Sequence, residues 1–460
     1  MSLIKSISGI RGTIGGKVND NLTPIDAVRF ATAYGMWLKE QNANENLTII
    51  LGRDARISGK MVSSLVANTL IGLGINVVDL GLSTTPTVEV AVTLENADGG
   101  IIITASHNPK QWNALKLLNN KGEFLNAAEG EKILKIAKEE AFLFAEVDHL
   151  GQYKKKKGYI NKHIQEVLNL DLVDVEAIKK SNFKVVVDAV NSTGGIAIPA
   201  LLEKLGVECV QLYCEPNGHF PHNPEPLKEH LADISELVVL EKAHFGIVVD
   251  PDVDRLALIC EDGSMFGEEY TLVACADYVL GKTKGNTVSN LSSSRALRDI
   301  TLKHGGSYQA SAVGEVNVVE LMKATNAIIG GEGNGGIIYP ESHYGRDSLV
   351  GVALFLTHLA NLKMSCKELR DSYPNYYMSK NKIELTPEID VDTVLETIAS
   401  NYKNEDVSTI DGVKINFETE WVHLRKSNTE PIIRIYTEST SQTSADELAK
   451  RFIYEIKSII

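Results

Sequence analysis

The sequence predicts an α/β protein: three similar α/β domains followed by a C-terminal α+β domain. Two observations lead to this prediction. A strand–helix–strand pattern recurs three times, and the final segment is rich in strands. The length of 460 residues agrees with it, because a domain usually takes about 100–200 residues. We expect the four domains to cover residues 1–152, 153–258, 259–372 and 373–460.

Each repeat begins with a short strand, continues with an apolar helical face that ends near a glycine, and closes with a second strand. This order of elements is typical of α/β units. The interval of about a hundred residues is too long for a solenoid repeat, which takes about 20–50 residues. The repeats cover residues 48–51 with 61–82, residues 184–187 with 196–213, and residues 286–288 with 295–310, the third being the weakest copy.

The C-terminal part follows a different pattern. From about Tyr373 onward the sequence is rich in strands, and it ends in a helical segment over residues 444–460. Ser444 and Glu447 have the spacing of a capping box, in which two side chains satisfy the first free N–H groups of a helix. We therefore expect an α+β domain that closes with a helix.

The charge of the chain limits its partners. The formal net charge is -14 and the pI is about 5.4, whereas nucleic-acid binding in bulk needs a basic surface. We therefore expect no nucleic-acid partner. An anionic small substrate is still allowed if Arg, Lys and backbone N–H groups form a local island. The basic run Lys154–Lys157 is better explained as a solvated surface near the first domain junction.

The sequence also predicts a cytoplasmic protein with no membrane partner. It has no run of about 18 apolar residues, so no transmembrane helix is expected. The N-terminal residues lack the apolar segment of a signal peptide. The five cysteines are odd in number and never spaced as CxxC, which indicates reduced thiols. The sequence is compatible with a monomer and with an oligomer.

Residues 101–116 combine a buried strand with reactive side chains. The apolar run Ile101–Ile103 stops at the sequence Thr-Ala-Ser-His-Asn-Pro. Strands of parallel sheets end in this way, and ligands collect at their carboxyl ends. Ser106 is followed at once by His107 and later by Lys116, and a hydroxyl beside proton-transfer groups suggests a covalent intermediate on Ser106. A polar turn closed by Asn-Pro is the alternative.

A second strand runs into three alternating carboxylates. Residues 246–249 lead into Asp250, Asp252 and Asp254, with Pro251 between the first two. Proline disfavours a regular central strand, so a loop is expected. Three like charges this close repel one another unless a cation lies between them, and all-oxygen ligands suit Mg²⁺ or Mn²⁺. The EF-hand glycine and distal glutamate are missing, which disfavours calcium. An acidic turn is the alternative.

A glycine-rich loop follows in the third repeat. Residues 330–336 contain five glycines in seven residues, which lets the backbone approach a ligand closely. Glu332 and Asn334 offer groups that hydrogen-bond sugar hydroxyls. A flexible turn also explains the glycines. A dinucleotide fingerprint is disfavoured, because no helix pattern follows directly.

Basic residues beside small polar side chains predict an anion site near the C-terminus. Arg425 and Arg434 flank Ser427, Asn428 and Thr429. Arginine pairs with phosphate through two hydrogen bonds, and the backbone N–H groups of a loop add to this. In an acidic chain, this composition favours an anion site over an ordinary capped turn.

Arg53 and Arg56 lie in a further polar segment, which closes a strand and opens a helix. A functional role and a structural pairing with acidic neighbours explain these two arginines equally well.

Taken in order, these motifs resemble the four signature loops of the α-D-phosphohexomutases, enzymes that interconvert hexose 1- and 6-phosphates. Thr-Ala-Ser-His-Asn-Pro resembles the phosphoserine loop, and Asp-Pro-Asp-Val-Asp-Arg the metal loop. Gly-Glu-Gly-Asn-Gly-Gly resembles the sugar loop, and Arg-Lys-Ser-Asn-Thr-Glu-Pro the phosphate loop. The resemblance covers essentially the whole chain. It implies three related α/β domains with mixed sheets and a fourth, TBP-like α+β domain around a central cleft.

The resemblance also implies roles for individual residues. Ser106 would carry a phosphoryl group and exchange it with a sugar phosphate through a hexose 1,6-bisphosphate. Ser106, Asp250, Asp252 and Asp254 would hold Mg²⁺. Lys116 is the first candidate for proton transfer, with neighbouring cations lowering its pKa and with His107 and Arg11 assisting. Contacts to the substrate would come from Arg255, Glu332, Asn334, Arg425, Ser427, Asn428, Thr429 and Arg434.

The chain departs from the common family pattern at a few positions. Pro251 stands where the metal loop usually has Gly, and Gly336 stands where a His often ends the sugar loop. The resemblance therefore supplies no second histidine as an acid or base.

The sugar loop also bears on the substrate. The sequence Glu-Gly-Asn-Gly-Gly resembles the sugar loop of archaeal-type and some bacterial phosphoglucosamine mutases, whereas mutases for glucose and mannose phosphates more often have Ser at the position of Asn334. We expect conversion of glucosamine 6-phosphate to glucosamine 1-phosphate. The alternatives are a phosphoglucomutase/phosphomannomutase and, less favoured, a non-catalytic sugar-phosphate sensor of the same fold.

Overall fold

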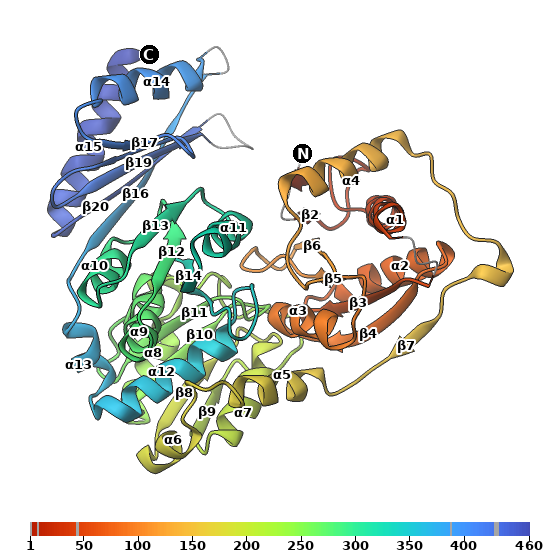
Figure 1. Ribbon diagram of the computed structural model, residues 1–460, viewed down its shortest axis with the longest axis horizontal. Helices are drawn as coiled ribbons and strands as arrows, with labels where there is room; N and C mark the ends of the chain where they lie inside the picture. Colours follow the sequence, from red (N-terminus) through yellow and green to blue (C-terminus); the bar gives the residue numbers. More distant parts are fainter. Residues whose placement is uncertain (1, 7–8, 43–45, 387–388, 427–431) are drawn as a thin grey trace.

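Four sheets organise the chain, one in each of four successive domains, I to IV (Figure 1). The computed structural model describes residues 2–6, 9–42, 46–386, 389–426 and 432–460. Domains I to III each combine a mixed sheet with helices, and domain IV has an antiparallel sheet with two helices. This confirms the predicted fold class.

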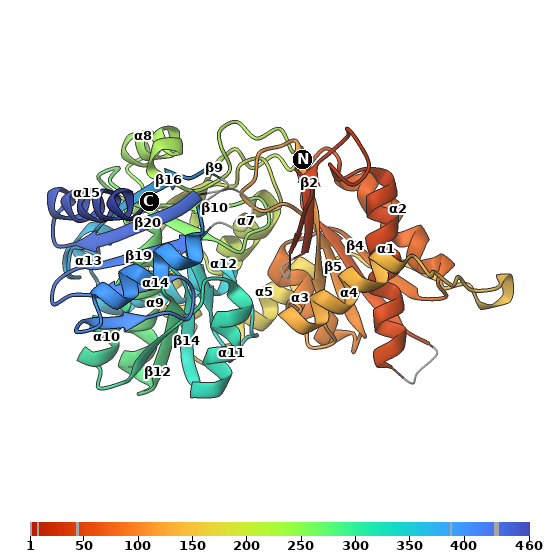
Figure 2. The same cartoon turned by 90° about the horizontal axis from the view of Figure 1, so that it is seen from above.

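Domain I is built on a seven-stranded sheet with the order β1-β2-β6-β5-β3-β4-β7. Successive side chains of a strand face opposite sides of the sheet. Ile101 and Ile103 therefore pack in the layer that contains α1, α2 and α4, whereas Ile102 packs in the layer of α3. Figure 2 shows β2, β4 and β5 between α1 and α2 on one side and α3 on the other.

The elements of domain I are β1 (Ile4–Ser6), β2 (Gly9–Thr13), α1 (Pro24–Gln41), β3 (Thr48–Arg53), α2 (Gly59–Gly72), β4 (Asn76–Leu82), α3 (Thr85–Leu94), β5 (Gly99–Ile103), β6 (Trp112–Leu118), α4 (Ala127–Glu139), the 3-10 turn η1 (Val147–His149) and β7 (Tyr153–Lys155). β7 pairs with the edge strand β4. Lys154 and Lys155 are exposed on it, as expected for a solvated basic run.

Domains II and III repeat the central part of this sheet. Their strand orders are β11-β10-β8-β9 and β15-β14-β12-β13, which correspond to β6-β5-β3-β4 of domain I. In each copy three strands are parallel and the last returns antiparallel as a hairpin. The turn between the third strand and its antiparallel partner therefore occupies the same place in all three domains.

The elements of domain II are α5 (Tyr159–Leu168), α6 (Val175–Ser181), β8 (Lys184–Asp188), α7 (Gly194–Lys204), β9 (Glu208–Leu212), η2 (Lys228–His230), α8 (Ala232–Leu240), β10 (Phe245–Val249) and β11 (Leu256–Cys260). Those of domain III are α9 (Glu268–Lys282), β12 (Asn286–Asn290), α10 (Ala296–Lys303), β13 (Tyr308–Ser311), α11 (Glu315–Thr325), β14 (Ala327–Glu332), β15 (Gly336–Ile338), α12 (Ser348–Leu362) and α13 (Cys366–Asp371).

Domains II and III share one hydrophobic core. Phe355 of α12 lies between them, with its ring centroid 5.4 Å from that of Phe245 and 5.3 Å from that of Phe266. Both contacts are edge-to-face, the arrangement that aromatic quadrupoles favour. Domain I and domain IV have separate cores. Domains II and III therefore form one packed unit, beside which domains I and IV stand.

Domain IV has a five-stranded antiparallel sheet in the order β16-β20-β19-β18-β17. Its C-terminal helix begins earlier than expected, because Ser441 and not Ser444 is the N-cap. The hydroxyl of Ser441 accepts a hydrogen bond from the backbone N–H of Ser444. The elements are β16 (Tyr377–Glu384), α14 (Val391–Asn401), β17 (Asp406–Ser408), β18 (Val413–Asn416), β19 (Trp421–Lys426), β20 (Ile432–Ser439) and α15 (Gln442–Ile459).

All five cysteines are free thiols. Of the helices in the described ranges, none has the length and apolar character needed to cross a membrane.

Candidate active site

The equivalent hairpin turns of domains I, II and III carry the first three sequence motifs, and all three turns meet. They join β5 to β6, β10 to β11 and β14 to β15. A cavity of about 740 Å³ opens where they come together. The predicted site residues that line it are Arg11, Ser106, His107, Lys116, Arg255, Glu332 and Asn334. The three aspartates of the β10–β11 turn are fully buried beside it.

Ser106 lies at the head of the first turn. Its backbone has a φ of 49°, a left-handed conformation that a non-glycine residue adopts only when its surroundings hold it there. The backbone N–H of Ser106 donates to Thr104 Oγ1 at 3.0 Å, and Thr104 Oγ1 donates to Asp54 Oδ2 at 2.7 Å. The Ser106 hydroxyl is thereby held at the cavity, with 6% of the residue exposed.

Arg56 stabilises the same turn through hydrogen bonds to its backbone. It is 1% exposed and forms an ion pair with Asp54 at 3.0 Å. Its guanidinium also donates to the carbonyl oxygens of Ser106, Asn108, Pro109 and Trp112. The sequence left structure and function equally open for this arginine; the contacts are structural.

We expect Arg56→Lys to lower the free energy of unfolding by about 1–3 kcal/mol, because an ammonium group cannot reproduce the planar fork and leaves buried carbonyls unpaired. Arg53→Lys is the matched control, since Arg53 is half-buried and donates to one carbonyl. Urea unfolding of both variants measures the difference. Equal losses would contradict this stabilising role of Arg56.

The aspartates lie directly across from Ser106. The Ser106 hydroxyl donates to Asp250 Oδ2 at 2.6 Å, and Asp250 Oδ1 accepts from the backbone N–H groups of Asp254 and Arg255. Burial and the neighbouring carboxylates raise the pKa of Asp250 well above its usual range. Burial also opposes the charge of Asp254, but Arg346 and Lys116 outweigh it and lower the pKa of that carboxyl.

These carboxylates fit a divalent metal ion. One oxygen each from Asp250, Asp252 and Asp254 lies within 4.8 Å of the others. The Oδ1 atoms of Asp252 and Asp254 are buried, and neither has a hydrogen-bond partner among the described residues. Buried carboxylate oxygens without partners are unfavourable unless a cation compensates them. All the donors are oxygen, which matches Mg²⁺.

The charged groups next to Lys116 are not the ones expected from the sequence. Its Nζ lies 2.7 Å from Asp252 Oδ2 and 3.2 Å from Asp254 Oδ2. Burial disfavours the ammonium charge, but these two carboxylates prevail and raise the pKa of Lys116 above its usual range. The expectation that neighbouring cations lower this pKa was wrong, because the closest charges are negative. The Lys116 ammonium group donates hydrogen bonds to both carboxylates.

His107 and the arginines form a second electrostatic group. His107 Nδ1 lies 3.4 Å from Ser106 Oγ. Burial and the positive charges of Arg255 and Arg11 lower the pKa of His107 far below its usual range, so its imidazole is neutral at physiological pH. Arg11 comes from β2 and donates to Asn108 Oδ1 at 3.1 Å. A neutral imidazole beside the serine is able to accept a proton.

The third turn brings Glu332 and Asn334 to the opposite wall. Glu332 accepts hydrogen bonds from Asn290 at 2.8 Å and from Arg346 at 2.9 Å. Asn334 Oδ1 accepts from the backbone N–H of Gly336 at 3.2 Å. Both side chains also line the cavity.

Arg346 is a site residue that the sequence reasoning missed. Its buried guanidinium contacts Asp254 at 2.7 Å, Glu315 at 3.1 Å and Glu332 at 2.9 Å. A Cβ atom at Gly336 would lie 2.2 Å from Arg346 Cδ, so the arginine uses the space that a side chain at that position would need. An isolated arginine before the apolar helix α12 was the available sequence signal.

Glu315, the first residue of α11, was also missed. It lines the cavity and accepts hydrogen bonds from both the backbone N–H and the Nε of Arg346. Burial raises its pKa, although Arg346 acts in the opposite direction. No motif marks it in the sequence.

The fourth motif is only partly described. Ser427, Asn428 and Thr429 lie outside the described residues. Arg425 and Arg434 are paired across β19 and β20, and Arg425 forms an ion pair with Asp411 at 2.9 Å. Neither of these arginines is among the described residues that line the cavity. The structure therefore brings together the first three motifs but not these arginines.

The chain matches four consecutive family models described as phosphoglucomutase/phosphomannomutase. The models are alpha/beta/alpha domain I over residues 4–144, domain II over 158–263, domain III over 267–377 and the C-terminal domain over 382–454. All four model regions occur in order along the chain.

Named relatives cover nearly the full length. A phosphoglucomutase/phosphomannomutase of Thermococcus kodakarensis is 36% identical, over 95% of this chain and 96% of its own. A phosphoglucosamine/phosphogalactosamine mutase of Sulfurisphaera tokodaii is 32% identical, over 100% and 99%. The crystal structure of a phosphoglucomutase/phosphomannomutase family protein from Burkholderia thailandensis superposes with a TM-score of 0.84 at 25% identity, covering 99% of this chain and 98% of that one.

Proposed function

Because the chain belongs to the α-D-phosphohexomutase family, and is thus an intramolecular phosphotransferase, we propose that Ser106 carries the transferred phosphoryl group and that glucosamine 6-phosphate is the preferred substrate. The observation that carries the first part is the hydrogen bond of the Ser106 hydroxyl to Asp250 at the head of the cavity. The non-catalytic sensor is not favoured.

The reaction needs two proton transfers, which we assign to Lys116 and His107. In the forward step the bond between Ser106 Oγ and phosphorus breaks, and a bond forms from phosphorus to the free hydroxyl of the sugar phosphate. Lys116, held protonated by its carboxylate partners, donates a proton to the seryl oxygen. We assign the acceptance of the proton from the attacking hydroxyl to His107, whose neutral imidazole lines the cavity beside Ser106. The product of this step is a hexose 1,6-bisphosphate.

Asp250, Asp252, Asp254 and Ser106 would hold Mg²⁺. When bound, the ion supplies positive charge that offsets the phosphoryl oxygens. After the bisphosphate turns over in the cavity, the same groups act in reverse on its other phosphate. Arg11 and Arg255 supply the positive wall for the anionic ends. Arg425, Ser427, Asn428, Thr429 and Arg434 are proposed to bind the distal phosphate.

The substrate preference rests on the charge of the opposite wall. Glu315, Glu320 and Glu332 from domain III line the cavity together with Asn317 and Asn334. A 2-amino group is cationic at neutral pH and interacts favourably with carboxylates and amide oxygens, whereas the hydroxyl of glucose or mannose gains less. The phosphoglucomutase/phosphomannomutase alternative is favoured by one observation, the 36% identity to a relative of that name.

A substrate panel with one variant tests this preference. We expect the wild type to show its largest kcat/KM with glucosamine 6-phosphate, compared with glucose and mannose 6-phosphates. Asn334→Ser should lower the ratio of kcat/KM for glucosamine 6-phosphate over glucose 6-phosphate by about 10-fold, the worth of one hydrogen bond to a charged group. Asn68→Ser, on the exposed surface of α2 and outside the cavity lining, is the control and should leave this ratio unchanged. A wild type that prefers glucose or mannose phosphate would refute glucosamine specificity and leave the mutase reaction standing.

A further inference from the structure

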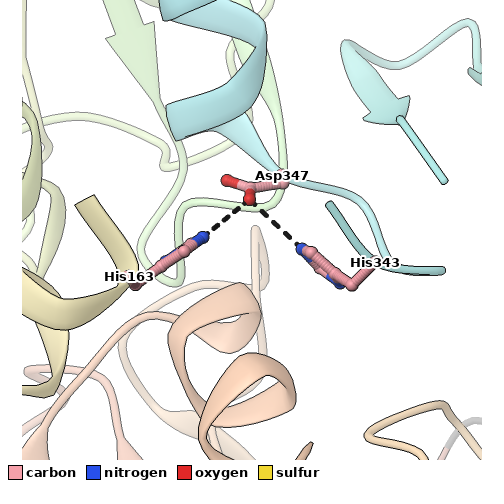
Figure 3. A group of neighbouring side chains, drawn as sticks. All are labelled: His163, His343 and Asp347. Carbon is pink, nitrogen blue, oxygen red and sulfur yellow. Dashed lines mark hydrogen bonds and ion pairs between the residues drawn. The ribbon is translucent and has the colours of Figure 1, made fainter. Parts of the chain in front are cut away.

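A second cluster of titratable side chains lies where domains I, II and III meet, and none of its members lines the cavity. His163 comes from α5, and His343 and Asp347 come from the segment that leads into α12. Figure 3 shows both imidazoles directed at the same carboxylate. The Nε2 atoms of His163 and His343 lie 2.9 Å and 3.2 Å from Asp347 Oδ2.

A side chain of domain I lies against the other nitrogen of each ring, as a hydrogen-bond partner for His163 and as an ion-pair partner for His343. Thr87 Oγ1 lies 3.0 Å from His163 Nδ1, and Glu89 Oε2 lies 3.3 Å from His343 Nδ1. Both oxygens belong to α3 of domain I. Metal-ligating histidines in proteins almost always have their second nitrogen fixed by a carboxylate, hydroxyl, carbonyl or water, which orients the ring. Asp347 is likewise fixed, because its Oδ1 accepts from backbone N–H groups of α12.

The buried carboxylate of Glu89 is a second, independent observation that favours a cation at this cluster. It is 1% exposed, and neither carboxylate oxygen has a hydrogen-bond partner among the described residues. Its ion-pair partner is His343. A buried carboxylate with so little compensation is unfavourable. Two neutral imidazoles and one divalent cation would balance the charges of Glu89 and Asp347 together.

We propose that this cluster is a binding site for a divalent transition-metal ion of the Zn²⁺ type, with His163 Nε2, His343 Nε2 and Asp347 Oδ2 as ligands. The three ligand atoms lie within 4.8 Å of one another. Two imidazole nitrogens and one carboxylate oxygen form a donor set that suits zinc, with a fourth position for water, and that Mg²⁺ does not favour. The site is therefore chemically distinct from the aspartate triad.

The ion would fasten three domains to one another. Its ligands come from domains II and III, and from domain I Thr87 contacts His163 and Glu89 forms an ion pair with His343. Asp347 directly follows Arg346, so the same ion would steady the segment that delivers this arginine to the cavity. We assign the site a structural role, because its ligands lie outside the cavity wall.

Metal content measures the proposal directly. The full-length protein is stripped with a chelator, incubated with Zn²⁺ in the presence of excess Mg²⁺, desalted and analysed for bound zinc. We expect about one zinc per chain in the wild type and a loss of that zinc in His343→Gln. Glu89→Gln, which removes only the orienting charge, should weaken Zn²⁺ binding by about 10–100-fold.

Two control variants locate the ion. His304→Gln removes a histidine that pairs with Asp277 elsewhere in domain III and should bind zinc like the wild type. Asp250→Asn alters the aspartate triad and should also keep the zinc. Adding Zn²⁺ should raise the Tm of the wild type and of both controls, but not that of His343→Gln.

Three results would overturn the proposal: no zinc bound by the wild type, wild-type zinc content in His343→Gln, or loss of the zinc in Asp250→Asn. The last result would mean that the zinc occupies the aspartate triad. If His343→Gln fails to fold, as circular dichroism would show, the affinity of Glu89→Gln decides the question. An unchanged zinc affinity in that variant would then count against the site. None of these readouts depends on mutase activity.

Discussion

Ser106→Ala should lower mutase turnover by at least about 10³-fold, because alanine has no oxygen to carry the phosphoryl group and the remaining groups of the site act as a unit with it. Substrate binding should change little, since the serine hydroxyl interacts with Asp250 rather than with Glu332 or Asn334. Turnover is measured with glucosamine 6-phosphate and an activating hexose 1,6-bisphosphate, and binding by calorimetry.

Intact mass provides the decisive control for this variant. The wild type treated with hexose 1,6-bisphosphate should gain one phosphoryl group, about 80 Da, and Ser106→Ala should gain none. Ser64→Ala, on the exposed side of α2, should gain the same mass as the wild type. Near-normal turnover in Ser106→Ala, or an unchanged mass gain, would disprove the covalent role of this serine.

Arg346→Ala should lower the free energy of unfolding at neutral pH by about 3–5 kcal/mol, the usual effect of removing one partner from a buried ion pair. The guanidinium compensates Asp254, Glu315 and Glu332 at once, so its loss leaves three buried carboxylates without a common partner. Mutase activity should fall as well, since Asp254 belongs to the aspartate triad and Glu332 lines the cavity.

The pH dependence of the unfolding free energy distinguishes this loss of charge from the effect of the cavity that the substitution leaves. Burial already raises the pKa of Glu315 with Arg346 present, and removing the arginine raises it further. A carboxyl group with a raised folded-state pKa stabilises the fold below its unfolded pKa, about 4.3 for Glu, and this contribution is lost as pH rises through the folded-state pKa. The loss of unfolding free energy in Arg346→Ala should therefore become smaller as pH falls from 7 toward the unfolded-state pKa of Glu, about 4.3.

Denaturant unfolding at several pH values measures this trend. Arg298→Ala is the control. Among the described residues, Arg298 forms an ion pair with its neighbour Asp299 on the partly exposed surface of α10, and its loss should change stability by less than about 0.5 kcal/mol. A loss in Arg346→Ala that is the same at all pH values would contradict the electrostatic explanation.

The sequence was most informative where local patterns and folded structure coincide. The run Ile101–Ile103 lies in β5 and is fully buried, and Pro251 lies in a turn between strands. The strand–helix–strand repeats correspond to three sheets of one topology. They could be predicted because the spacing of apolar residues and the position of turns are local properties of the sequence. The start of α15 was missed by a few residues, since Ser441 and Ser444 are chemically alike as caps.

Long-range electrostatics could not be derived from the sequence in the same way. The state of Lys116 depends on Asp252 and Asp254, which lie far away in the chain and in another domain. Arg346 has no motif around it, and only the folded structure shows that it joins acidic residues from three separate segments. Such partners are set by tertiary packing, which residue spacing does not encode.

The equivalent hairpin turns divide the cavity wall among three separate sheets. The first turn carries Ser106, the second carries Asp250, Asp252 and Asp254, and the third carries Asn334. Each turn is held by the pairing of its own two strands. Asn334 is therefore a position at which the cavity can be redesigned by engineering while the strand pairing of all three hairpins is kept.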